Sequence, residues 1–281
     1  MKFNNLTRVI CYSVCILILT SILLGGMGLK VFRFRGRADS GTLGNGTADP
    51  SQIRGIEIDW ASGSITIKPT PGIDSIRFSE SASYTNIDPM VWSIEDNILS
   101  IDFCEDAVSF GYTINYSKDL VIEVPENWLC RELEIDVASA EVYVLNMSID
   151  NFDFDGASGT CRLEHCTVNK LDIDAASGDV YFSGALNEMN FDGVSGTCNL
   201  VLTNIPRFVN LDGVSGDLDI TLPSDCGFTV TTGGLSSSFH CEFDTTSNSS
   251  QQYVHGDGSF KIVCQGISGD VTIRKGDYTA Q

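Results

Sequence analysis

Aspartate recurs at one position of a repeated motif, three residues before a serine that is usually followed by glycine. The aspartates are Asp136, Asp155, Asp174, Asp192 and Asp212, and Asp59 precedes an isolated copy of the motif. If the copies stack, these carboxylates form a row at about 4.8 Å spacing, where neighbouring charges repel by about 1 kcal/mol even in water. Each aspartate could accept backbone N–H bonds from its own turn, or the row could bind Ca²⁺, which takes several oxygen ligands.

The turn interpretation is favoured, because the sequence lacks the Gly-Gly-x-Gly-x-Asp repeat of calcium-binding β-helices. The ten cysteines include no Cys-x-x-Cys pair. His165, His240 and His255 form no ligand spacing, and His240 is expected at the surface. We therefore expect no cofactor other than a Ca²⁺ row.

Catalytic motifs are missing as well. The nearest nucleophile motif is Gly-Val-Ser-Gly, whereas a nucleophile elbow needs Gly-x-Ser-x-Gly. The serine recurs in every copy, as a turn residue would and a nucleophile would not. We expect no catalytic residue and no enzyme. A glycan-active β-helix enzyme is the less favoured alternative, because a fold that hosts such enzymes does not imply the activity.

The motif repeats with a period of about 19 residues, which is typical of a solenoid. Its serines are Ser139, Ser158, Ser177, Ser195 and Ser215, at intervals of 19, 19, 18 and 20 residues. Outlying copies stand at Ser62 and Ser268, with a degenerate copy at Ser236. The 77 residues from Ser62 to Ser139 leave room for degenerate coils or an irregular insertion.

Apolar and polar residues alternate on both sides of each serine, which is the pattern of β-strands with one buried face. The sequence therefore predicts an all-β, parallel stacked β-solenoid with Ser-Gly turns along one edge. Antiparallel hairpins are the alternative, because short turns join the half-repeats. The inward positions are expected three and five residues after each serine. They hold Ile65, Val142, Cys161, Val180, Cys198, Leu218, Phe239 and Val271, and then Ile67, Val144, Leu163, Phe182, Leu200, Ile220, Cys241 and Ile273. Cys264 is expected in the core too, whereas Cys104, Cys130, Cys166 and Cys226 lie outside the pattern and could form disulfides.

The N-terminal part has a different composition. Residues 1–8 are followed by 21 uncharged residues, 9–29, which are long enough to cross a membrane as a helix. A retained anchor is favoured over a cleaved signal peptide, whose apolar core would be about 7–15 residues. Residues 30–55 read as a basic juxtamembrane segment and a linker, residues 56–275 as the repeat domain and residues 276–281 as a tail.

Charge bears on location and partners. Two basic residues precede the apolar segment and four follow it, which by the positive-inside rule places the domain in the cytoplasm. An acidic β-rich domain behind an N-terminal anchor is nevertheless a common envelope arrangement, and we expect a single-pass cell-membrane protein with its domain outside. The net charge of −20 argues against nucleic acid as a partner.

The sequence resembles the bacterial putative-adhesin family with β-strand repeats, a domain of unknown function. The resemblance rests on the repeated Asp-x-x-Ser-Gly cores, on "LVIEVPENW" (residues 120–128) and on "DLDITLPSDCGFTV" (residues 217–230). It implies a β-solenoid-like domain, commonly behind a membrane segment and linked to the cell envelope, without an established catalytic site. We expect a non-catalytic adhesion or binding module whose partner is an envelope glycan or another membrane protein. The alternative is a signalling or regulatory partner of a membrane stress-response complex.

Overall fold

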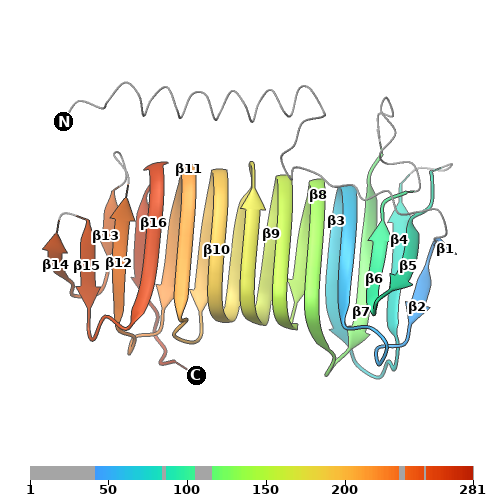
Figure 1. Ribbon diagram of the computed structural model, residues 1–281, viewed down its shortest axis with the longest axis horizontal. Helices are drawn as coiled ribbons and strands as arrows, with labels where there is room; N and C mark the ends of the chain where they lie inside the picture. Colours follow the sequence, from blue (N-terminus) through green and yellow to red (C-terminus); the bar gives the residue numbers. More distant parts are fainter. Residues whose placement is uncertain (1–41, 84–86, 105–115, 234–237, 250, 281) are drawn as a thin grey trace. The chain divides into compact units, whose positions relative to one another are not determined.

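The computed structural model describes residues 42–83, 87–104, 116–233, 238–249 and 251–280. Within these ranges the chain forms seventeen β-strands, joined in one sheet system, and no helix (Figure 1). None of these residues forms a helix that could span a membrane, and residues 9–29 lie outside the described part. The all-β fold with a large, mostly parallel sheet is therefore confirmed.

The strands of the first half are β1 (Thr42–Leu43), β2 (Gly46–Ala48), β3 (Gly55–Thr70), β4 (Ile76–Ala82), β5 (Val91–Glu95), β6 (Ile98–Asp102), β7 (Lys118–Pro125) and β8 (Leu129–Leu145). Those of the second half are β9 (Ser148–Ala175), β10 (Asp179–Leu202), β11 (Phe208–Leu222), β12 (Phe228–Gly233), β13 (Phe239–Cys241), β14 (Thr246–Ser249), β15 (Gln252–His255), β16 (Phe260–Ser268) and β17 (Val271–Lys275). Several of these strands bend around a corner, so that β9 alone runs for 28 residues.

Successive coils stack in register, as the repeat predicts. β8 pairs in parallel with β9, β9 with β10 and β10 with β11. Ser139 lies beside Ser158 and Ser195 beside Ser215, so the Ser-Gly corners align along one edge. Antiparallel pairing, the alternative considered from the sequence, occurs between strands at the two ends of the stack.

Glycine at the corner is required by the closeness of the coils. Gly159 has a φ of 132°, and a Cβ added there would lie 2.1 Å from the carbonyl oxygen of Ala140 in the neighbouring coil. Side-chain-bearing residues rarely adopt such a φ, and no atom fits at such a distance. The opposite turns also use the left-handed region, at Asn146, His165 and Gly184. His165 is thus a turn residue.

The core lies between the two walls of each coil and follows the predicted inward positions. All of those side chains are buried except Phe239 and Cys241, which are partly buried near the end of the stack. Cys264 is buried as expected. The period of two therefore identified the core correctly, and the two partly buried positions belong to β13, which pairs on one side with β17.

The outermost repeats are threaded into the stack out of chain order. β3 pairs on one side with β6 and β7 and on the other with β8, so Ser62 lies directly beside Ser139. Likewise β16 and β17 lie between β11 and the pair β12 and β13, which places Ser268 beside Ser215. Residues 70–130 were expected to hold either degenerate coils or an irregular insertion, and the structure contains both. β6 and β7 form one further coil, whereas β4 and β5 pair in antiparallel fashion. Ser236 lies outside the described residues.

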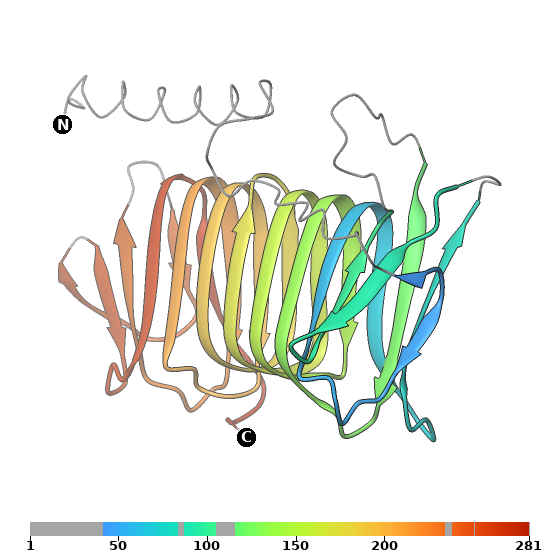
Figure 2. The same ribbon diagram turned by 45° about the vertical axis from the view of Figure 1, so that its right-hand side comes forward.

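Antiparallel strands cover both ends of the stack (Figure 2). β4 pairs with β7 and β5 with β6, and β14 and β15 extend the other end beyond β12. Such caps protect the open edges of a solenoid from pairing with other chains. Part of the expected linker belongs to this cap, because β1 pairs with β5 and β2 with β4. The expected tail also packs on the domain, where the Tyr278 hydroxyl donates to the Leu202 carbonyl.

Candidate functional site

The predicted aspartate row is present in the register of the strands. Asp59 pairs with Asp136, Asp136 with Asp155, and Asp192 with both Asp174 and Asp212. A backbone hydrogen bond from Ala176 to Gly156 joins the two coils of β9 beside Asp155 and Asp174. The motif thus correctly identified six aspartates that line up along one edge.

Asp102 is a seventh member that the sequence did not reveal. It lies at the end of β6 and pairs with Asp59. No serine follows it at the motif's spacing, since residue 105 is Glu, so the repeat pattern offered no signal. The out-of-order threading of β3 brings this carboxylate into the row.

Burial makes one end of the row electrostatically unusual. Asp59 is only 5% exposed, and its pKa is raised by burial first and then by the charges of Asp136 and Asp102. Burial and the neighbouring Asp155 raise the pKa of Asp136 to about 7. Burial likewise raises the pKa of Asp102. Asp59 shares side-chain hydrogen bonds with both neighbours, so a protonated Asp59 can donate to either carboxylate.

The other end of the row is open to solvent. Asp174, Asp192 and Asp212 are exposed, and the pKa of Asp192 is raised by partial burial and by Asp212. Among the residues that the structure describes, no group of three or more His, Cys, Asp or Glu side chains is arranged to hold a metal ion. Binding of Ca²⁺ along the row stays a prediction.

A different set of aspartates bonds to the corner backbone. Asp179, Asp217 and Asp270 stand two residues after the motif serine. Asp179 accepts the N–H of Thr197 at 2.9 Å, and Asp217 accepts the N–H of Asp270 at 3.0 Å, each from the neighbouring coil. Asp270 in turn accepts from the backbone and hydroxyl of Ser238. The sequence signal for this hydrogen-bonding role is the Ser-Gly-Asp order of these three copies, and the predicted aspartate row does not include these residues.

The four described cysteines outside the repeat pattern are buried thiols, and the structure joins none of these four in a disulfide. Cys104, Cys130, Cys166 and Cys226 are each at most 6% exposed. Burial raises the pKa of Cys130 to about 12 and that of Cys166 and Cys226 to about 11. A thiol with so high a pKa is a weak nucleophile at neutral pH. These residues therefore act as small core side chains.

Lys118 is a buried cation that the sequence did not reveal. Its ammonium lies 2.6 Å from Glu80 and donates to the carbonyls of Asp88 and Phe103. The rings of Trp60 and Phe103 lie beneath it, with centroids 5.2 and 4.3 Å away. Burial lowers the pKa of Lys118, while Glu80 opposes the shift. The group ties β4 to β7 and is closed to solvent, so it stabilises the cap.

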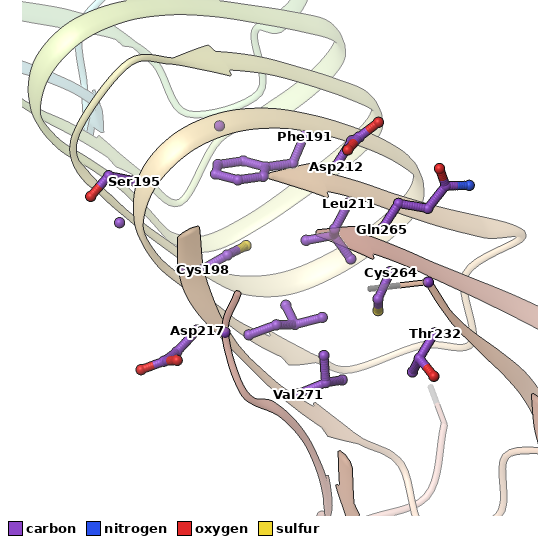
Figure 3. Close-up of a pocket in the computed structure, with 16 residues that line it drawn as sticks. Phe191, Ser195, Cys198, Leu211, Asp212, Asp217, Thr232, Cys264, Gln265 and Val271 are labelled. Atoms are coloured by element: carbon purple, nitrogen blue, oxygen red, sulfur yellow. The ribbon is translucent and has the colours of Figure 1, made fainter. Parts of the chain in front are cut away.

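A small cavity lies inside the coils formed by β10, β11, β16 and β17 (Figure 3). It measures about 70 Å³ and its wall is mainly apolar, with Phe191, Leu211, Cys198 and Cys264 around it. In Figure 3 the thiol groups of Cys198 and Cys264 face the cavity, while Ser195 and Asp217 point away from it. Its volume is about that of two water molecules. The cavity is a gap in the core and is too small for a substrate.

Larger hollows lie along the edge opposite the Ser-Gly corners. They are three hollows of about 200, 320 and 430 Å³ that share lining residues. Leu129 and Ser148 border the first and second, and Trp128 and Pro125 border the second and third. We call these three adjoining hollows, from Pro50 and Ile73 across Trp128 to Asn204, the axial groove. It crosses the turns of successive coils.

Similarity to known proteins places the chain in a family. Residues 50–274 match the family model described as Toastrack DUF4097. The chain belongs to the Toastrack DUF4097 family. This membership confirms the resemblance to the bacterial putative-adhesin family of unknown function that the motifs indicated. The matched residues include all the coils and the strands threaded between them.

Three solved structures are similar to this Toastrack domain. A putative adhesin of Bacteroides fragilis shares 15% identity over 83% of this chain and 97% of its own, with a TM-score of 0.45. A putative adhesin of Parabacteroides merdae shares 11% over 83% and 97%, with a TM-score of 0.42. A putative cell adhesion protein of Clostridium sporogenes shares 10% over 84% and 100%, with a TM-score of 0.40. No protein with a curated description matches the chain significantly.

Proposed function

We propose that this Toastrack protein is a non-catalytic binding module of the cell envelope. Residues 9–29 would anchor it in the cell membrane as a single span, and the solenoid would face outward. Adhesion, the role named for the solved structures, would be one form of such binding. Nucleic acid is not a candidate ligand, because the domain is strongly acidic.

The observation that carries the proposal is the parallel register of the coils. It repeats outward-facing side chains at about 4.8 Å along the stack, which suits a ligand that is itself repetitive. The buried ionisable groups Asp59 and Lys118 are bonded to neighbouring protein groups. They stabilise the stack and do not line a cavity of substrate size.

The test is cosedimentation of the full chain with purified, protein-free envelope material. We expect saturable binding to lipid-free envelope fractions, and this binding should be lost when the fold is disrupted by Val180→Asp. Association of residues 9–29 with lipid does not depend on the fold of the solenoid. If the chain does not sediment with any envelope fraction but copurifies with one membrane protein complex, the signalling alternative replaces the proposal. If the chain does sediment, periodate oxidation of the sugar rings in the envelope fraction separates glycan from lipid as the binding component.

A further inference from the structure

We propose that the axial groove binds a neutral, linear polysaccharide laid along the axis of the solenoid. The inference rests on the proposed binding function and gives it a site and a ligand class. It is carried by the shape of the groove, the chemistry of its wall and its direction across the strands.

One half of the groove has a mixed polar and apolar wall that carries an aromatic side chain held by hydrogen bonds. Trp128 borders two hollows, and its indole N–H donates to the carbonyls of Pro50 and Ile53, both at 3.3 Å. These bonds fix the ring in place. Pro125 lies on the same wall, and the Leu129 side chain is 43% exposed beside it. A fixed aromatic face with adjoining aliphatic groups suits the C–H face of a sugar ring, and little side-chain freedom is lost on binding.

The other half of the groove carries amides in register. Asn169 and Asn187 lie on adjacent coils, and the Asn187 amide donates to the Asn169 side-chain oxygen at 3.0 Å. Asn204 is held by two bonds to the backbone of Leu186, at 2.8 and 2.9 Å. An amide offers two donors and an acceptor, so Asn169 and Asn187 retain groups for sugar hydroxyls. A linear polymer would meet an equivalent coil about every 4.8 Å.

The charge of the groove selects among polysaccharides. Of the described residues that line it, the ionisable ones are Glu126 and Asp150, and both are acidic. The whole chain has a net charge of −20. Uronates, sialylated chains and phosphate-bearing polymers would be repelled, because like charge raises the cost of association. A neutral glycan avoids that cost.

The direction of the groove disfavours an extended peptide. The groove crosses the strands, whose backbone N–H and C=O groups are already paired with neighbouring coils. A peptide could not add to the sheet there, because strand addition requires an open edge. A proline-rich peptide, which uses aromatic grooves without strand addition, is the competing ligand to be tested.

The experiment titrates the full chain with a hexamer of β-1,4-linked glucose and a hexamer of β-1,4-linked N-acetylglucosamine, by calorimetry and tryptophan fluorescence. The variants are Leu129→Ala and Asn187→Ala, both on exposed side chains. Ile94→Ala is the matched control, because Ile94 is also 43% exposed but lies on the cap strand β5. We expect at least one neutral hexamer to bind. We expect each groove variant to weaken that binding by about 3- to 10-fold, and the control to leave it unchanged.

A hexamer of galacturonate should bind at least about 10-fold more weakly than the neutral hexamers, since its charge opposes that of the groove. The inference is overturned if neither neutral hexamer binds, if the groove variants leave binding unchanged, or if a proline decamer binds in their place. Cosedimentation with envelope material distinguishes this failure from that of the broader proposal. If the groove variants sediment as well as the unmodified chain does, the binding function stands and the groove assignment falls.

Discussion

Replacing Asp59 by asparagine should stabilise the domain at alkaline pH. Asp59 is almost completely buried between Asp102 and Asp136 on adjacent strands. Above neutral pH the three carboxylates lose their protons and repel one another at close range. Asparagine has nearly the same shape and no charge, and its amide offers two donors to the two neighbouring carboxylates. Asp59→Asn therefore removes the repulsion and keeps the hydrogen bonds.

The magnitude follows from the spacing of the strands. Two unit charges about 4.8 Å apart repel by about 0.9 kcal/mol in water and about 3.5 kcal/mol at an effective dielectric constant of about 20. Because the row is buried at Asp59 and partly open at its neighbours, we take about 1 kcal/mol for each neighbour. The gain at pH 8.5 is then about 2 kcal/mol, or about 4–8 °C in melting temperature for a domain of this size.

The pH dependence has a definite sign. The pKa of Asp136 is about 7 in the folded chain, against about 3.9 for an unfolded aspartate. The folded state therefore binds more protons between these values, and the free energy of unfolding falls as pH rises from about 4 to about 7. Asp49, Asp172 and Asp257 have lowered pKa values, so they titrate below this window. Melting should accordingly occur at a higher temperature at pH 5.5 than at pH 8.5.

The assay is thermal melting of the full chain and the variant at both pH values. Asp59→Asn should melt higher than the unmodified chain at pH 8.5 and close to it at pH 5.5, where Asp59 is already protonated. Asp192→Asn is the control, because Asp192 is an exposed member of the same row. It should shift melting by less than about 2 °C. A melting temperature that rises with pH across this range, or an Asp59→Asn variant that is less stable at pH 8.5, would refute the reasoning.

Three further perturbations test other parts of the structure. Val180→Asp places a charge in the core and should abolish cooperative unfolding, whereas Val180→Ala should lower the free energy of unfolding by about 2 kcal/mol. If circular dichroism shows that the Val180→Asp variant is folded, Val180 does not belong to the core. Glu80→Gln and Lys118→Met should each lower the free energy of unfolding by about 3 kcal/mol, because each leaves the charge of its buried partner without an opposite charge. In urea unfolding, the double variant should lose less stability than the sum of the two single variants. Millimolar Ca²⁺ should raise the melting temperature if the aspartate row binds it, and an unchanged melting curve with and without chelator would remove that interpretation.

The repeated motif was enough to predict the coils and their core. A period of about 19 residues with alternation around each serine determined the parallel register and the inward side chains. The order of the coils could not be predicted, because the motif at Ser62 is compatible with any place in the stack. Its position beside Ser139 depends on long-range pairing of β3 with β6, β7 and β8.

The sequence predicted less of the candidate sites than of the fold. The aspartate row was visible because its members share a place in the motif, but Asp102 joins it through threading alone. The buried Lys118 had no periodic signal, and neither did Trp128 of the axial groove. Trp128 and Asn187 are brought to one surface by coils that are far apart in the chain, so their common role emerges only from the stacking of the turns.

The most direct test of the central proposal, an envelope-anchored binding domain that faces outward, is protease treatment of intact cells that produce the full chain with a tag at its C-terminus. The account predicts that protease added outside removes the tag and the solenoid while a cytoplasmic control protein stays intact. An N-terminal fragment containing residues 9–29 should remain with the membrane fraction. Protection of the domain in intact cells, with cleavage only after lysis, would place it in the cytoplasm and contradict the proposal.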